Sequence, residues 1–119
     1  MAKTNFKKRI SLEERKNEAS RIFKKYPERI PIIVERSNSC KSIGDIDRNK
    51  FLVPADLSMG QFMHIIRQRI KLDSSQAMYL FVGDSMAPTS KMIAQIYNDF
   101  KDEDGFLYVT YASESTFGN

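Results

Sequence analysis

Cysteine and long apolar runs are nearly absent from this sequence. Cys40 is the only cysteine, so no disulfide can form within the chain. No apolar run approaches the roughly 20 residues that a membrane-spanning helix needs, and the N-terminus lacks the continuous apolar stretch of a secretory signal. We therefore expect a cytoplasmic protein in a reducing environment, which could attach to a membrane only peripherally or covalently.

The residues that usually carry metal binding and catalysis are also scarce. With one His and one Cys, a structural zinc site would have too few of its preferred ligands. An enzymatic interpretation would pair Cys40 as nucleophile with His64 as base, but Cys40 lies in a polar segment and His64 inside a helical pattern. We therefore expect no enzyme, no metal and no other cofactor.

The chain also has few residues that disfavour a packed core. It holds five Gly and four Pro, and 41% of its residues are hydrophobic, which is typical of a globular protein. A length of 119 residues suits one domain.

The net charge of +4 is unevenly distributed, because residues 1–50 carry +7 and residues 51–119 carry −3. The basic half could favour anionic lipids, nucleic acid or acidic peptides, or could simply be a solvated helix. Interleaved aromatic residues of the kind that read RNA are missing, so we expect no specific nucleic-acid partner.

Two capping boxes mark the starts of predicted helices. The first runs from Ser11 to Glu14 and opens a helix that Pro27 stops, with acidic residues early and basic residues late, as the helix dipole prefers. Its apolar stripe is narrow, so this helix should lie on another element. Residues 4–9 are expected to be a short helical or irregular lead-in. The second box, Ser58 to Gln61, opens a helix with apolar residues at helical spacing as far as residue 70.

A third helix is predicted after Pro88, with Ser90 as its cap and Asp104-Gly105 at its end. Four apolar segments predict strands, at residues 30–34, 50–53, 78–82 and 106–111. The first two should pair antiparallel. Pro31 has no amide hydrogen to donate to a ladder. Either its amide side should face a sheet edge, or Pro31 should precede the paired stretch. The order strand, strand, helix, strand, short helix, strand is the β-grasp arrangement of ubiquitin, an α+β fold.

Several segments, spread in order over nearly the whole chain, resemble the autophagy-related protein eight family, which includes GABARAP and the microtubule-associated light-chain-three proteins. They are Lys24-Lys-Tyr-Pro-Glu-Arg-Ile-Pro31, Ile43-Gly-Asp-Ile-Asp47, Lys50-Phe-Leu-Val-Pro54, Gly60-Gln-Phe62, Ile66-Arg-Gln-Arg69, Pro88-Thr-Ser90 and Tyr108-Val-Thr-Tyr-Ala-Ser-Glu-Ser-Thr-Phe-Gly118. The resemblance implies a ubiquitin-like β-grasp with two additional N-terminal helices. We expect a single domain over residues 1–119, with a helical extension at 1–27, a β-grasp core at 28–112 and a flexible C-terminal tail at 113–119.

The resemblance also implies lipid conjugation through Gly118. A cysteine protease would cleave before Asn119, and activating and conjugating enzymes would then carry the new carboxylate to the amine of phosphatidylethanolamine. Glycine suits narrow enzyme channels because it has no Cβ. The chain would move from the cytoplasm to the autophagosome membrane. A ubiquitin-like module that binds peptides but is never conjugated remains the alternative.

Partner recognition is the second implication of the resemblance. Cargo receptors and autophagy factors of this family's pathway bring an aromatic residue followed three positions later by Leu, Ile or Val, and this short peptide adds a strand beside residues 50–53. The implied aromatic pocket consists of Glu18, Ile22, Pro31, Ile33, Lys50, Leu52 and Phe106. The implied aliphatic pocket consists of Phe51, Val53, Pro54, Leu57, Phe62 and Ile65. Arg29 and Arg69 match basic positions beside the groove. Each apolar residue taken alone could belong to the core, and for Val53, Leu57 and Phe62 taken singly the core is the better interpretation.

Overall fold

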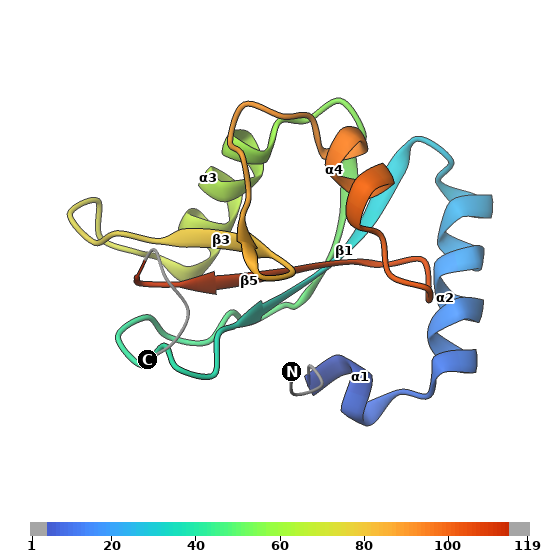
Figure 1. The fold of residues 1–119 in the computed structure, drawn as a ribbon, viewed down its shortest axis with the longest axis horizontal. Coiled ribbons are helices and arrows are strands. Elements are labelled where there is room, and N and C mark those ends of the chain that lie inside the picture. The colour runs from blue at the N-terminus through green and yellow to red at the C-terminus, as the bar shows by residue number, and fades with distance from the viewer. Residues whose placement is uncertain (1–4, 115–119) are drawn as a thin grey trace.

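A computed structural model describes residues 5–114, and Figure 1 shows its mixed sheet with helices packed around it. The elements are α1 (Asn5–Arg9), α2 (Leu12–Lys25), β1 (Arg29–Arg36), β2 (Lys50–Pro54), α3 (Met59–Ile70), β3 (Tyr79–Val82), β4 (Ser85–Met86), α4 (Ile93–Phe100) and β5 (Leu107–Ala112). The strand order is β2-β1-β5-β3-β4, with β1 and β5 parallel and the other pairs antiparallel. This is the predicted order of elements with one addition, the two-residue strand β4. Gly118 and Asn119, the predicted conjugation and cleavage positions, lie outside the described residues.

The two capping boxes form to different extents. Ser58 and Gln61 make the complete box, in which each side chain accepts the other residue's backbone amide, at 3.1 and 2.9 Å. At α2, the Ser11 hydroxyl accepts the Glu14 amide at 3.2 Å as predicted. The Glu14 carboxylate, however, accepts from the Ser11 hydroxyl and not from its backbone amide. The first box is therefore only half formed, although the helix start is where the sequence placed it.

The start of α4 differs from its prediction. Ser90 does not cap this helix, which begins at Ile93 and ends at Phe100. The amide of Ile93 donates to the carbonyl oxygen of Leu57 at 2.8 Å. A neighbouring backbone segment thus satisfies this donor, and the Gln95 side chain accepts the amide of Met92, the residue before the helix, at 3.1 Å.

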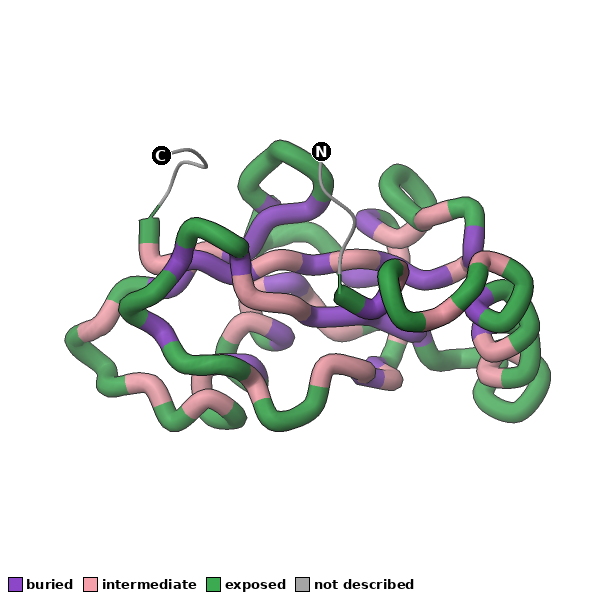
Figure 2. The backbone as a smooth tube through the Cα atoms, turned by 90° about the horizontal axis from the view of Figure 1, so that it is seen from below, coloured by how far each residue is buried: buried purple, intermediate pink, exposed green. Residues whose placement is uncertain are grey.

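Side chains of β1 alternate between two apolar clusters on opposite faces of the sheet. Ile32 belongs to the main core with residues of α3 and α4, whereas Ile33 belongs to a smaller cluster with Phe6, Ala19 and Phe106. Figure 2 shows that the buried residues follow the strands, whereas many loop residues are exposed. The smaller cluster attaches the two N-terminal helices to the sheet.

Pro31 lies in an inner strand, between β2 and β5. The parallel pairing of β1 with β5 begins at Ile32, one residue after the proline. Pro31 thus precedes the stretch paired with β5, but it lies inside the stretch paired with β2, opposite Leu52, so the predicted placement before the paired stretch holds only for β5.

Candidate functional site

Strand β2 forms one edge of the sheet and, within the described residues, pairs only with β1. The amide of Val34 donates to the carbonyl oxygen of Asn49 at 2.7 Å, which fixes the alternation of the antiparallel ladder. The backbone amide and carbonyl groups of Lys50 and Leu52 therefore point away from β1. They form a short row of donors and acceptors that an added strand could use.

The predicted aromatic set gathers on the α2 side of this edge. Ile33, Phe106 and Pro31 are buried, whereas Glu18, Ile22, Lys50 and Leu52 are half-buried. Because the register places Ile33 opposite Lys50 and Pro31 opposite Leu52, these four side chains lie on one face. Ile22 packs against the same cluster from α2. The set has an apolar floor and a partly accessible rim.

An ion pair crosses the rim of the aromatic set. The ammonium of Lys50 on β2 contacts the carboxylate of Glu18 on α2, and it also lies 5.5 Å from the centre of the Phe6 ring. Both charged side chains remain partly exposed, at 37% for Lys50 and 24% for Glu18. The pair therefore links α2 to β2 above a floor in which Ile33 and Phe106 are fully buried.

Most of the predicted aliphatic set lies on the opposite face, beside α3, whereas Pro54 follows Leu52 by two residues in β2 and so lies on the face of the aromatic set. Phe51, Val53 and Phe62 are buried, Leu57 is half-buried, and Pro54 and Ile65 are exposed. The rings of Phe51 and Phe62 meet edge to face with centroids 5.6 Å apart. Phe62 is fully buried and supports the set from below, whereas Ile65 is 38% exposed. The accessible part of this set is therefore Leu57, Pro54 and Ile65.

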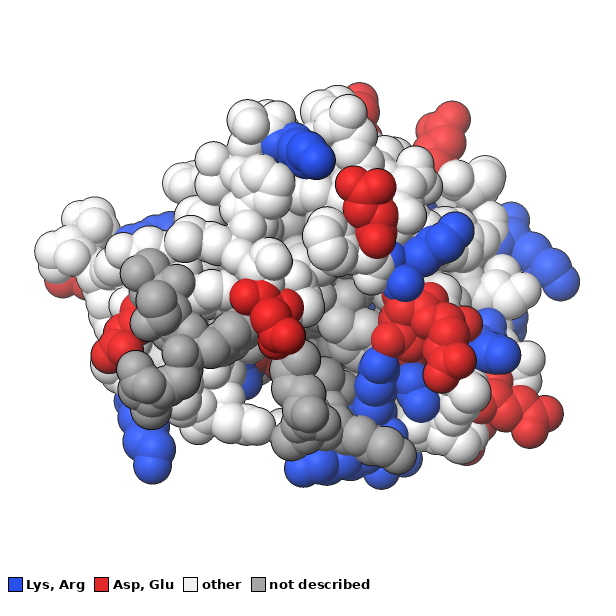
Figure 3. Space-filling model, in the orientation of Figure 1, with Lys and Arg blue, Asp and Glu red and all other residues white. Residues whose placement is uncertain are grey.

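The two basic positions are held differently. Arg29 lies on β1 opposite Pro54, and its Nη1 donates to the carbonyl oxygen of Leu52 at 3.0 Å. Arg69, near the end of α3, pairs with Asp47 at 3.0 Å. Figure 3 shows charges of both signs interspersed on the visible face. The sequence reasoning did not assign Asp47 as the partner of Arg69.

Residues 5–114 contain the single cysteine and the single histidine of the chain. No group of three His, Cys, Asp or Glu side chains in this range could hold a metal ion, and no helix there is long and apolar enough to cross a membrane. Cys40 is buried with its thiol 3.8 Å from the Ser113 hydroxyl, whereas His64 is exposed on α3. Burial raises the pKa of Cys40, but hydrogen bonding to the backbone of Ile43 and to Ser113 outweighs it, so the net pKa is lowered.

Comparison with known proteins decides the family. The family described as autophagy protein Atg8, ubiquitin like, matches residues 14–118. This chain belongs to the Atg8 family. It is 50% identical to autophagy-related protein 8a of Arabidopsis thaliana over 119 residues, which cover 100% of this chain and 97% of that relative. It is 51% identical to autophagy-related protein 8B of Oryza sativa subsp. indica, over 99% of this chain and 98% of that relative.

The fold comparison agrees with the family assignment. The crystal structure of Trypanosoma brucei ATG8 superposes with a TM-score of 0.90 at 40% sequence identity, covering 98% of this chain and 100% of that one. The predicted ubiquitin-like α+β fold with N-terminal helices is therefore confirmed. As an Atg8-family member, the chain is an autophagy protein of the ubiquitin-like modifier type.

Proposed function

We propose that this Atg8-family chain is conjugated through Gly118 to phosphatidylethanolamine and recruits partner proteins by adding a peptide strand to β2. The observation that carries the recruiting function is the free edge of β2 between two apolar sets on opposite faces of the sheet. The partners are short aromatic-x-x-aliphatic segments of cargo receptors and autophagy factors.

The arrangement of the two sets accounts for the spacing and direction of such a segment. Successive side chains of an extended peptide point to opposite faces, so residues three apart also do. The aromatic set uses Lys50 and Leu52, whereas the aliphatic set uses Phe51, Val53 and Pro54, which lie on average further along the strand. A peptide whose aromatic residue comes first must therefore run parallel to β2.

The expected affinity is modest. Burial of one aromatic and one aliphatic anchor contributes roughly 1.5–3 kcal/mol each. Most of that gain is offset by ordering a flexible peptide and by lost translational freedom. We therefore expect dissociation constants on the order of micromolar, which allow partners to exchange.

Conjugation rests on the family match, which extends to residue 118. A trimming cysteine protease would release Asn119, and activating and conjugating enzymes would transfer the Gly118 carboxylate to the lipid amine. Because phosphatidylethanolamine has two acyl chains, the product would hold firmly to a bilayer, whereas one chain gives only marginal anchoring. The chain would then pass from the cytoplasm to the autophagosome membrane.

Intact mass measures the conjugation route directly. Incubation with the trimming protease should remove the mass of one Asn residue, and the full enzyme set should then add one phosphatidylethanolamine. Gly118→Ala should block both steps and leave peptide binding unchanged. An unchanged mass of the wild-type chain would instead support the unconjugated peptide-binding module.

Titration of a labelled aromatic-x-x-leucine peptide measures the recruiting function. Leu52→Ala removes a half-buried side chain from the aromatic set and should weaken binding about tenfold. Leu72→Ala, at another half-buried leucine that lies outside both sets, is the matched control and should bind like the wild type. Equal binding by all three proteins would exclude this edge as the peptide site.

A further inference from the structure

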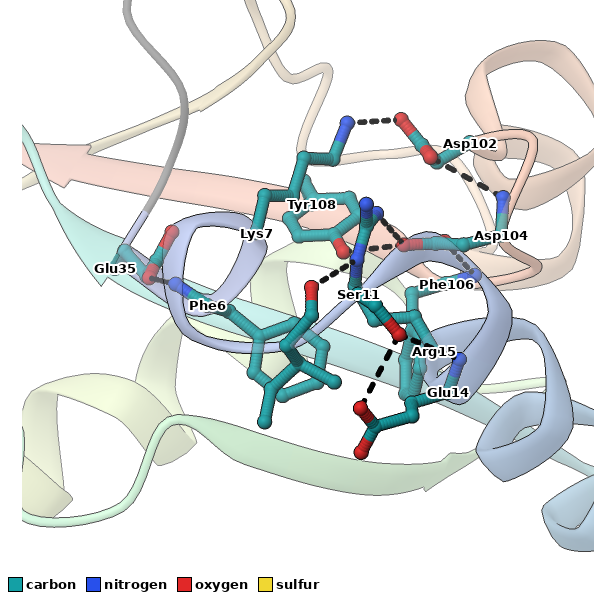
Figure 4. Close-up of polar contacts among 11 residues, drawn as sticks. Phe6, Lys7, Ser11, Glu14, Arg15, Glu35, Asp102, Asp104, Phe106 and Tyr108 are labelled. Atoms are coloured by element: carbon teal, nitrogen blue, oxygen red, sulfur yellow. Dashed lines mark hydrogen bonds and ion pairs between the residues drawn. The ribbon is translucent and has the colours of Figure 1, made fainter.

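Helix α2 buries a charged side chain against the core. Arg15 is 8% exposed and Asp104 is 2% exposed, and Arg15 Nη1 lies 2.7 Å from Asp104 Oδ2. Arg and Asp are rarely buried in proteins unless they are paired. Figure 4 shows this pair at the centre of a set of polar contacts between α2 and the segment that leads into β5.

The carboxylate of Asp104 connects three parts of the molecule. Its Oδ1 accepts the backbone amide of Phe106 at 2.8 Å, and its Oδ2 accepts the hydroxyl of Tyr108 at 2.5 Å as well as the guanidinium. Arg15 also donates through Nε to the carbonyl oxygen of Ile10 at 3.0 Å. Burial lowers the pKa of Arg15, but its bonds to Asp104 and Tyr108 raise it by more, so the guanidinium stays charged.

Backbone packing keeps the same segment close to α2. Gly105 has a φ of +94°, and a Cβ at this position would lie 2.9 Å from the Cβ of Ala19. The hydroxyl of Tyr97 donates to the carbonyl oxygen of Gly105 at 2.7 Å. The loop that precedes Phe106 is thus fixed on both sides, by α2 and by α4.

The aromatic set depends on this docking for two of its walls. Glu18 and Ile22 follow Arg15 by three and seven residues, so all three lie on one side of α2. Phe106, the buried floor of the set, is held through its amide by Asp104. A shift of the pair would therefore move the α2 wall relative to the floor.

We propose that Arg15 and Asp104 are positioning residues for partner recognition, which hold α2 and Phe106 at the separation that admits an aromatic side chain. The inference rests on the proposed peptide-binding function. A buried ion pair gives little net stability compared with well-packed apolar side chains, whereas the loss of one partner leaves the other charge uncompensated. The pair thus fixes a geometry more than it adds stability.

The test uses a peptide with tryptophan as its aromatic anchor, because the protein contains no Trp and the peptide emission is then observed alone. In the wild type, binding should shift this emission to the blue as the indole leaves water. Asp104→Ala should weaken binding about tenfold, within the range that coupled neighbouring residues show, and should reduce the blue shift at saturation. Asp104→Asn keeps an oxygen for the Phe106 amide. Its affinity and its blue shift should lie between those of the wild type and those of Asp104→Ala.

Two further variants complete the design. Asp99→Ala removes an exposed carboxylate of α4 whose nearest cation, Lys91, is 4.0 Å away, and should bind like the wild type. Arg15→Lys keeps the charge but replaces the guanidinium fork with a single ammonium group, and should weaken binding by a smaller factor than Asp104→Ala. If Asp104→Ala does not fold, Arg15→Lys and Asp104→Asn test the positioning role in its place.

The outcomes separate three cases. Weaker binding with a smaller blue shift at saturation supports the positioning role. Unchanged affinity in folded variants overturns it, and so does weaker binding with an unchanged saturated emission, because general destabilisation alone leaves the bound complex intact. Failure of the wild-type chain to bind the peptide would reject the proposed peptide-binding function itself.

Discussion

The guanidinium of Arg29 donates a hydrogen bond to the carbonyl oxygen of Leu52, with a distance of 3.0 Å between Nη1 and the oxygen. This carbonyl points to the open edge of β2, so an added strand must compete with Arg29 for it. Arg29→Ala should therefore tighten binding of a peptide with uncharged flanks. It should weaken binding of a peptide with acidic residues after its aliphatic anchor, since a displaced Arg29 could pair with them.

Each change should be small, about 1 kcal/mol or less, because Arg29 is exposed. Titration of both peptides against wild type and Arg29→Ala measures the two effects. About 0.5 M salt should reduce only the effect on the peptide with acidic residues. Arg69→Ala serves as the control for the uncharged peptide, whose affinity should not change. Shifts of the same sign for both peptides would contradict the competition.

Phe62 and Ile65 separate stability from recognition within the aliphatic set. Phe62 is fully buried in the main core, so Phe62→Ala should lower the free energy of unfolding by about 3–5 kcal/mol. Ile65 is 38% exposed, so Ile65→Ala should cost under about 1 kcal/mol of stability. It should nevertheless weaken binding of a peptide with a leucine anchor several-fold.

Urea unfolding and peptide titration, performed on both variants, measure these two quantities. A second peptide with alanine at the aliphatic position is the control, because it should bind the wild type and Ile65→Ala equally. If Ile65→Ala bound the leucine peptide as tightly as the wild type does, Ile65 would not belong to the peptide site.

The local elements of the fold were largely predictable because their signals are short-range. Ser58 and Gln61 form their capping box within four residues, and the alternation of Phe51 and Val53 with their neighbours follows from strand geometry. Ser90 failed as a cap because the donor that needed a partner, the Ile93 amide, bonds to the carbonyl of Leu57, far earlier in the chain. A contact of that kind leaves no signal near the helix start.

Long-range polar contacts were likewise beyond the sequence pattern. Arg15 is one of many basic residues in the first half of the chain, and its partner Asp104 lies 89 residues away. The same holds for Arg29, whose contact with a backbone carbonyl involves no residue type that a motif could specify. The members of the aromatic and aliphatic sets were predicted from the family resemblance. The faces of the sheet on which they lie are known only from the structure.

Gly105 and Gly44 give a matched pair for the docking of α2. Alanine at Gly105 would be strained by the φ of +94° and would place its Cβ 2.9 Å from that of Ala19. Gly105→Ala should therefore lower the free energy of unfolding by about 1–3 kcal/mol. A Cβ added at Gly44 would meet no atom within 4 Å, and Gly44 has no positive φ, so Gly44→Ala should change stability by under about 1 kcal/mol.

Denaturant unfolding of the two glycine variants measures the difference. Amide hydrogen exchange along α2 should also be faster in Gly105→Ala and unchanged in Gly44→Ala, because only the former displaces the helix. Equal stability of the two variants would show that the approach of Ala19 to Gly105 can relax without cost.

Tyr111 makes stability depend on pH in the alkaline range. Burial, with a further contribution from the charge of Asp45, raises its pKa to about 12 in the folded state, compared with about 10 for an ordinary tyrosine. The folded state then holds the proton more tightly than the unfolded state. This contribution to stability is therefore complete below about pH 10 and is lost as the pH rises towards about 12.

The variant Tyr111→Phe isolates this contribution. It should cost about 1 kcal/mol at pH 7, because the Tyr111 hydroxyl donates to the Gly44 carbonyl oxygen at 2.7 Å. Urea unfolding at a series of pH values should show the wild type and variant running parallel from pH 7 to about 9 and converging above about pH 10, since only the wild type loses this contribution. Curves that stayed parallel up to about pH 12 would show that Tyr111 does not titrate differently in the two states.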